Sequence, residues 1–168
     1  MAFSGTSLET QKSVDMTGGI MARGNFDFSD ILAPMMIRIP LGLIFMAHGS
    51  QKLFGLFGGA GLTGTFRLFE EKMGIPPIFT LLAIIAEFGG GFGVLTGFLT
   101  RISATGIAAV MMVAIYKVHW SGGFFLNIAC IPGRQHGMEY NLALLGMALF
   151  LMLAGGGRWC IDRLIFKR

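Results

Sequence analysis

The residues best suited to chemistry form a short polar cluster inside an apolar stretch. His48, Gln51 and Lys52 place an imidazole, an amide and an ammonium group within five positions of one another. If the stretch is helical, Gln51 and Lys52 both lie within about 60° of His48 on one face. An imidazole can exchange a proton near neutral pH, and an ammonium group can stabilise negative charge. This cluster needs partners from elsewhere in the chain. A purely structural hydrogen-bonding role for His48 is the alternative.

A single carboxylate, Glu87, lies near the middle of a second apolar stretch and is followed by several glycines. On a helix, Gly91 lies within about 40° of Glu87, and small residues allow another helix to approach closely. We therefore predict that Glu87 faces a helix contact. A charged group near the centre of a bilayer costs on the order of 2.5 to 3.5 kcal/mol, so such a group is usually paired or serves a pathway. Glu87 is a candidate proton carrier, or alternatively a protonated or lysine-paired carboxyl that joins helices.

Further candidates follow at the ends of two later apolar stretches: Lys117 and His119, then Glu139 and Tyr140. Lys52, Lys117 and Glu139 have an alternative as interfacial anchors. No metal site is predicted, because Cys130 and Cys160 lack metal-binding spacing, and a haem held by two histidines has no further support.

The composition predicts the setting of these residues. Hydrophobic residues make up 54% of the 168 positions and charged residues 13%, and the mean hydropathy is +0.69. These values indicate an integral membrane protein in contact with the lipid bilayer. The net charge of +4 does not indicate a nucleic-acid partner, since the basic residues are scattered or lie at the ends of apolar runs.

We predict an all-α fold, an integral membrane four-helix bundle. The expected spans cover about residues 31–54, 77–99, 102–118 and 138–154. Residues 55–76 predict an amphipathic segment lying in the interface between helices one and two. Arg38, about two turns into the first span, is expected to extend to the near interface, with a buried anion contact as the alternative. Residues 1–30 are predicted to form a mobile cytoplasmic tail, 31–165 the membrane domain, and 166–168 a basic C-terminal end.

Topology follows from the Lys and Arg residues on each side of the predicted spans. Seven lie on one side and five on the other, namely Lys12, Arg23, Arg101, Arg158, Arg163, Lys167 and Arg168 against Lys52, Arg67, Lys72, Lys117 and Arg134. Both termini are therefore predicted to be cytoplasmic. The polar candidates then lie in the outer half of the bundle, and the two cysteines lie on opposite sides.

Several motifs occur together in one order. They are His48-Gly-Ser-Gln-Lys52-Leu-Phe-Gly55, Glu87 with its glycines, Leu99-Thr100-Arg101, Lys117-Val-His119 with Gly123-Phe124-Phe125, and Glu139-Tyr140. Through these motifs the chain resembles the DoxX family over about residues 31–165. The resemblance implies a small multi-pass protein of the cytoplasmic (inner) membrane of a prokaryote. The name-giving members of that family are linked to quinone-dependent oxidation of sulfur compounds.

The residues and the resemblance together predict a membrane-embedded oxidoreductase component that acts at a quinone. The expected catalytic residues are Glu87, His48 and Glu139, and the expected quinone-binding residues are Gln51, Lys52, Lys117, His119 and Tyr140. Apolar walls are expected from Phe45, Phe54 and Trp120. No covalently bound cofactor is predicted, since haem-attachment, iron-sulfur and dinucleotide motifs are absent, so electrons must come from a partner oxidoreductase or a bound reductant. Two alternatives are a non-catalytic scaffold or anchor for such a partner, and a proton or small-molecule conduit.

Overall fold

The computed structural model describes residues 26–166, and within that range it contains helices and no strand. The elements are α2 (Phe26–Phe54), the 3-10 turn η1 (Leu56–Gly58), α3 (Gly61–Met73), α4 (Pro77–Thr96), α5 (Thr100–Ala114), the π-helical turn η2 (Ile115–His119), the 3-10 turn η3 (Trp120–Gly122), α6 (Glu139–Ala154) and α7 (Ile161–Phe166). The predicted all-α class is confirmed. Helix α2 already includes the last residues of the predicted tail, and the rest of that tail lies outside the described residues.

Three stretches of the described chain are long and apolar enough to cross a membrane. They are Leu32–Phe54, Pro77–Thr96 and Thr100–Gly122, with 23, 20 and 23 residues. The fourth expected span is the apolar helix α6, which has 16 residues. At 1.5 Å per residue it is about 24 Å long, shorter than a hydrocarbon core of about 30 Å. The helical membrane bundle is thus confirmed, with a fourth helix that is shorter than a full span.

Glycines bring α2 and α4 into the most extensive helix contact of the fold. A methyl group added at Gly49 would lie 2.5 Å from the backbone nitrogen of Phe88, and one at Gly91 would lie 2.7 Å from that of Met46. Neither position has room for a side chain, so the two backbones meet as they do in tightly packed membrane helices. The predicted contact at Gly91 is confirmed, whereas the need for glycine on α2 was not foreseen.

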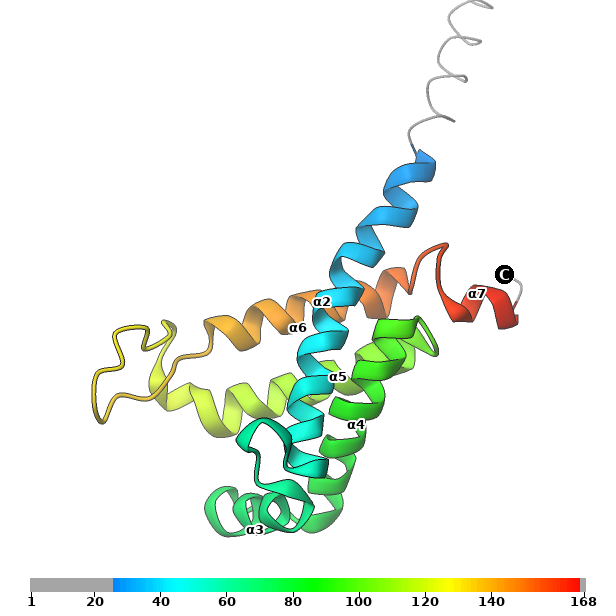
Figure 1. The fold of residues 1–168 in the computed structure, drawn as a ribbon. Helices are drawn as coiled ribbons and strands as arrows, with labels where there is room; N and C mark the ends of the chain where they lie inside the picture. The colour runs from blue at the N-terminus through cyan, green and yellow to red at the C-terminus, as the bar shows by residue number, and fades with distance from the viewer. Residues whose placement is uncertain (1–25, 167–168) are drawn as a thin grey trace, which may run out of the picture.

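The buried core joins all four long helices. Leu41 and Phe45 of α2, Val94 of α4, Ile107 of α5 and Leu151 of α6 are each almost fully buried. In Figure 1 α5 and α6 run beside each other and cross the α2/α4 pair. The two pairs diverge away from the crossing, with α3 at the end of one pair and the loop before α6 at the end of the other (Figure 1).

Arg38 joins α2 to the C-terminal segment. Its side chain is buried, and its two terminal nitrogens donate to the carbonyls of Gly156 and Trp159 at 3.2 and 2.7 Å. The sequence favoured extension to the near interface, and this expectation was wrong because the segment after α6 folds back over the guanidinium. Arg38 is therefore a structural residue that satisfies peptide carbonyls inside the bundle.

Helix α3 confirms the predicted amphipathic segment. Its outer face carries the exposed pair Arg67 and Glu71, whose side chains lie 3.6 Å apart. On the other face Thr65 is buried and its hydroxyl donates to the carbonyl of Lys52 at 3.2 Å. This bond fixes α3 against the last turn of α2, beside the polar candidates.

Candidate functional site

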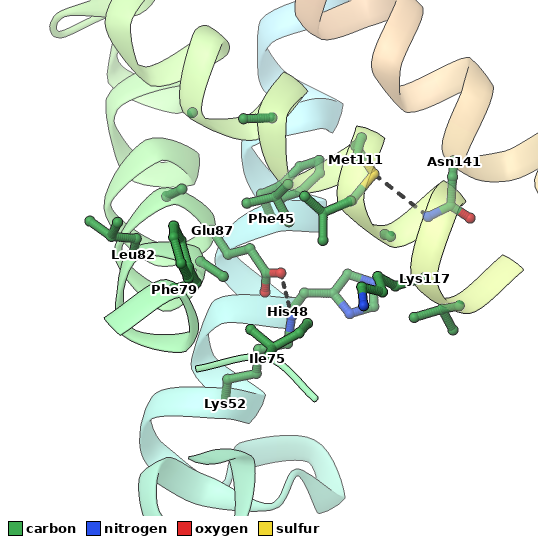
Figure 2. Close-up of a pocket in the computed structure, with 18 of the residues that line it drawn as sticks. Phe45, His48, Lys52, Ile75, Phe79, Leu82, Glu87, Met111, Lys117 and Asn141 are labelled. Atoms are coloured by element: carbon green, nitrogen blue, oxygen red, sulfur yellow. Dashed lines mark hydrogen bonds and ion pairs between the residues drawn. The ribbon is translucent and has the colours of Figure 1, made fainter. Parts of the chain in front are cut away.

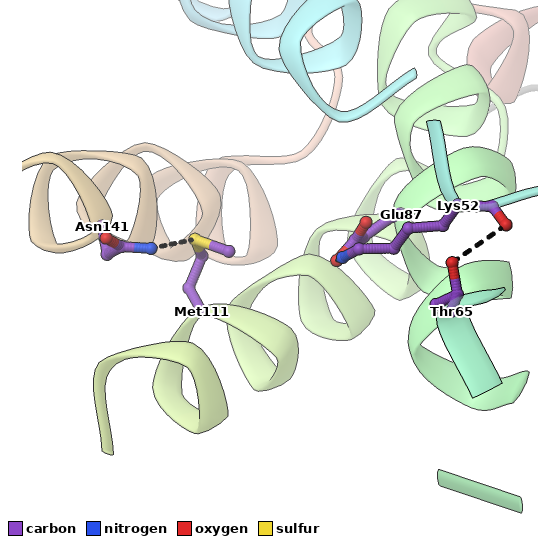
Figure 3. Close-up of polar contacts among 5 residues, drawn as sticks. All are labelled: Lys52, Thr65, Glu87, Met111 and Asn141. Carbon is purple, nitrogen blue, oxygen red and sulfur yellow. Dashed lines mark hydrogen bonds and ion pairs between the residues drawn. The ribbon is translucent and has the colours of Figure 1, made fainter. Parts of the chain in front are cut away.

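The centre of the site is an ion pair between α2 and α4. Lys52 Nζ donates to Glu87 Oε1, and the Lys52 and Glu87 side chains are 25% and 3% exposed (Figure 3). The ammonium group also lies 5.4 Å from the centre of the Phe69 ring of α3, within the range of a cation–π contact. The prediction that Glu87 faces a helix contact is confirmed, and its partner is the lysine of the opening cluster.

The second carboxylate oxygen of Glu87 has no partner. Oε2 is buried and makes no hydrogen bond with any residue in the described range 26–166. A buried acceptor without a donor is costly, and in native proteins such groups usually have a specific explanation. Oε2 can take up a proton or accept a hydrogen bond from a ligand.

A cavity of about 1230 Å³ lies where the α2/α4 and α5/α6 pairs diverge. Its walls are mostly apolar and include Phe45, Phe79, Leu82 and Leu144. Polar groups enter it from three of the long helices, α2, α4 and α6, from the turn η2 and from the loop before α6. They are His48, Lys52, Glu87, Lys117, His119, His136, Tyr140 and Asn141. Figure 2 shows His48, Lys52 and Glu87 grouped on one side of this space, with Lys117 entering from the α5 side.

A π-helical turn places Lys117 and His119. The chain leaves α-helical geometry at Ile115 and follows the wider π spacing through His119. Such turns are rare and occur frequently at functional sites, because the extra residue redirects the side chains around it. Here the redirected side chains of Lys117 and His119 reach the same cavity as the α2 and α4 residues.

The tautomer of His119 follows from its partner. Its Nδ1 lies 3.1 Å from the carbonyl oxygen of His136. A carbonyl can only accept, so Nδ1 carries the hydrogen and Nε2 of the neutral ring is left as an acceptor. His136 also lines the cavity and was not singled out from the sequence, since it lies in a loop whose local pattern gives no sign of the contact.

Asn141 is a further buried polar group that the set of predicted binding residues omitted. It is 7% exposed, lines the cavity, and donates from Nδ2 to the sulfur of Met111 at 3.6 Å (Figure 3). Thioether sulfur is a weak acceptor, so a better acceptor on a ligand would compete for this amide.

Two predicted site residues lie outside the cavity lining. Gln51 turns toward η1, where its amide nitrogen lies 3.4 Å from the carbonyl of Phe57. Glu139 accepts a hydrogen bond from the amide of Leu126 at 2.9 Å and so holds the loop before α6. Of the three expected apolar walls, Phe45 lines the cavity, while Phe54 and Trp120 do not.

The described residues contain no group of three metal-ligating side chains from the His, Cys, Asp and Glu classes. Cys130 in the loop before α6 and Cys160 just before α7 are free thiols, and the whole of α6 separates them in the chain. The side chains that line the cavity offer proton exchange and hydrogen bonding in apolar surroundings, with Lys52 balancing the charge of Glu87.

Apolar helices of spanning length, packed through glycines around a largely apolar cavity with a few polar groups, define a small integral membrane protein with a ligand-sized site. The comparisons with known proteins name the family. The model of the DoxX family matches residues 33–120, and the chain belongs to that family.

Three relatives are similar over most of their length. The chain is 31% identical to Inner membrane protein YqjF of Escherichia coli, over 80% of this chain and 92% of the relative. It is 33% identical to the membrane protein Rv3486 of Mycobacterium tuberculosis, over 79% of this chain and 80% of the relative. A Bacillus subtilis protein named "Putative oxidoreductase CatD" is 26% identical, over 81% of this chain and 89% of the relative. No solved structure matches the chain.

Proposed function

We propose that this protein is the quinone-binding, membrane-embedded component of an oxidoreductase. The observation that carries the proposal is the unpartnered Glu87 Oε2 at an apolar cavity that also holds His48 and Lys117. The apolar walls suit the ring and tail of a quinone, His48 and Lys117 can donate to its two carbonyls, and the free Oε2 can take up a proton and pass it to the reduced ring. The oxidoreductase name of the Bacillus subtilis relative agrees with this class of reaction.

The size and composition of the cavity fit a lipophilic ring. Ligand cavities typically measure about 300 to 1,000 Å³ and combine apolar walls with a few polar groups. The cavity of about 1230 Å³ can accept a quinone head and the first part of its tail. His48 and Lys117 are the donors we assign to the carbonyls. His48 lies on α2 and Lys117 lies on η2, so the two donors come from different parts of the fold.

The redox step must balance. Reduction of a quinone to a quinol takes up two electrons and two protons. In our proposal Glu87 first takes up a proton on the free Oε2 and passes it to the reduced ring, and Lys52 balances the carboxylate that remains. His48, in its doubly protonated imidazolium form, supplies the second proton. The described residues hold no electron carrier of their own, so the two electrons come from a reduced partner oxidoreductase or from a reductant bound beside the quinone.

The membrane and the orientation are part of the proposal. The name of the Escherichia coli relative supports the inner membrane. The bias of seven against five basic residues supports cytoplasmic termini, and in that orientation the cavity would lie in the outer half of the bundle. Reaction of purified right-side-out vesicles with a membrane-impermeant thiol reagent tests this, because exposed Cys130 would then be labelled from outside.

Quinone binding by purified protein tests the main proposal. The full chain is reconstituted in nanodiscs, and a short-tailed quinone such as ubiquinone-1 or a menaquinone analogue is titrated against it. We expect saturable binding at one quinone per chain, weakened about 10-fold or more in Lys117→Met and His48→Ala, because each variant removes a donor to a quinone carbonyl and a charge-assisted hydrogen bond contributes about 1.5 to 3 kcal/mol. Glu70→Gln, an exposed carboxylate on α3, is the control and keeps full affinity.

Saturable binding with equal affinity in all these variants would place the quinone elsewhere and contradict the site. No binding by folded wild-type protein would contradict the function. Melting temperature and elution volume establish that each variant is folded.

A scaffold function has one specific observation in its favour. The loop before α6 exposes apolar side chains, among them Phe125 and Ile128 at 66% and 83%. Its backbone is nevertheless well ordered by bonds such as Met138 N to Gly123 O at 3.0 Å, so it can present a fixed surface to a partner. Partner binding without quinone binding would favour this second function.

A further inference from the structure

A second cavity lies at the opposite end of the bundle and has a different chemical character. It measures about 1070 Å³, is open on one side, and is lined by Ala33 and Pro34 of α2, the start of α5, the end of α6 with the segment after it, and α7. Arginines from three places in the chain line it: Arg101, Arg158 and Arg163. From the sequence alone, these three arginines are interpreted as topology signals. Topology requires them only to be on one side of the membrane and does not require a shared cavity.

The guanidinium groups of Arg101 and Arg163 are available to a ligand. Neither makes an ion pair or a side-chain hydrogen bond with another residue in the described range. Arg101 lies against the end of α6, because a methyl group added at Gly155 would lie 3.4 Å from its Nε. The guanidinium thus lies along the wall of the cavity.

The one acidic group that lines this cavity is already engaged. The two oxygens of Asp162 accept from the backbone amides of Leu99 and Thr100, at 2.5 and 2.8 Å, at the first turn of α5. Both bonds stabilise the negative charge of Asp162, which lies at the positive end of the α5 dipole. The arginines that line the cavity therefore outnumber its carboxylate, and the local charge is positive.

The sides of the cavity are apolar and face outward. Ile102 is 69% exposed and Phe166 is 55% exposed, and Phe150 of α6 is also exposed. Ile102 lies near the start of a stretch that is long and apolar enough to cross a membrane, where its exposed side chain can meet an acyl chain. A cationic end with apolar sides matches a molecule that is anionic at one end and apolar at the other.

We propose that this cavity binds an anionic phospholipid, with its phosphate between Arg101 and Arg163 and an acyl chain along Ile102 and Phe150. The planar guanidinium group is well suited to phosphate, because it donates two parallel hydrogen bonds and keeps its charge. Basic pockets between helices at the cytoplasmic side are a known form of headgroup recognition. A free phosphate shares the anionic chemistry but gains nothing from the apolar sides, and this difference separates the two sources.

The test uses the full chain, purified and delipidated in a nonionic detergent. Retention of added phosphatidylglycerol is measured by native mass spectrometry, with phosphatidylcholine and inorganic phosphate as separate probes. We expect phosphatidylglycerol to be retained at one lipid per chain, phosphatidylcholine at least 10-fold less, and inorganic phosphate neither to bind alone nor to displace the lipid at equal concentration. Retention should fall as the salt concentration rises, since exposed charges are screened.

Variants assign the lipid to the site. Arg101→Gln with Arg163→Gln should reduce retention about 10-fold or more, while the control Arg134→Gln, an exposed arginine at the other end of the bundle, leaves it unchanged. If the double Gln variant does not fold, Arg101→Lys with Arg163→Lys keeps the charge and should still weaken retention measurably. Equal retention in the site and control variants, equal retention of phosphatidylcholine, or displacement by inorganic phosphate would each overturn the proposal.

Discussion

Lys52 and Glu87 are 35 residues apart in the chain, and their side chains form an ion pair at the wall of the larger cavity. The pair joins the last turn of α2 to the middle of α4. Oε1 of Glu87 makes the helix contact, while Oε2 has no partner among the described residues and is the candidate proton site.

Breaking this pair from the lysine side should be strongly destabilising. Lys52→Met leaves a buried carboxylate without its counter-charge, and we expect a loss of about 3 to 5 kcal/mol in the free energy of unfolding. The measurement is reversible unfolding in mixed detergent micelles.

The double variant Lys52→Met with Glu87→Met separates structure from chemistry. Replacing both charges by apolar side chains of similar length should recover most of the lost stability, because no buried charge is left unpaired. Quinone binding should persist, but protonation of the reduced quinone should slow, because the proton donor at the ring is gone. A stable double variant that forms quinol at the wild-type rate would show that the pair serves packing alone.

Gly49 should not tolerate even a methyl group. Gly49→Ala places a Cβ 2.5 Å from the Phe88 nitrogen and must separate α2 from α4, which we expect to cost about 1 to 3 kcal/mol. Gly146→Ala on α6 is the matched control, since nothing lies within 4 Å of its added methyl, and it should stabilise the helix by about 0.5 to 1 kcal/mol. Equal effects of the two substitutions would contradict the packing described for α2 and α4.

Glu139 should act on the loop and not on the proton path. Glu139→Gln keeps an oxygen that can accept from the Leu126 amide, so we expect the fold and the quinone affinity to be unchanged. Glu139→Ala removes the acceptor and should speed hydrogen exchange at Leu126. A Glu139→Gln variant that loses quinone binding as fully as His48→Ala would restore Glu139 to the site.

Arg38 should control the order of the C-terminal segment. Arg38→Lys cannot reproduce the two bonds to Gly156 and Trp159, and we expect a loss of about 1 to 3 kcal/mol. Hydrogen exchange at the Asp162 amide, which donates to the Gly97 carbonyl at 2.9 Å, reports the loosening. Quinone affinity should stay constant, because Arg38 does not line the larger cavity. A fall in quinone affinity without faster exchange would contradict a structural role for Arg38.

The candidate site shows where prediction from sequence succeeds. His48, Lys52, Glu87, Lys117, His119 and Tyr140 were expected to meet, and all of them line one cavity. The expectation was reliable because polar groups are costly in apolar helices and must find one another. Gln51 and Glu139 are also polar residues beside apolar stretches, but they form hydrogen bonds with the backbone of Phe57 and Leu126. A pattern of residue types does not distinguish a side chain that lines the cavity from one that bonds to a loop.

The sequence by itself determined the membrane class, the helix order and most helix bounds, because hydropathy and helix length are local properties. Only the tertiary structure decided that Lys52 pairs with Glu87, that a π turn redirects Lys117 and His119, and that Arg38 is buried under the C-terminal segment. These features depend on how closely two backbones approach and on a single residue of extra helical winding. Both depend on packing between segments far apart in the chain, so no local pattern contains them.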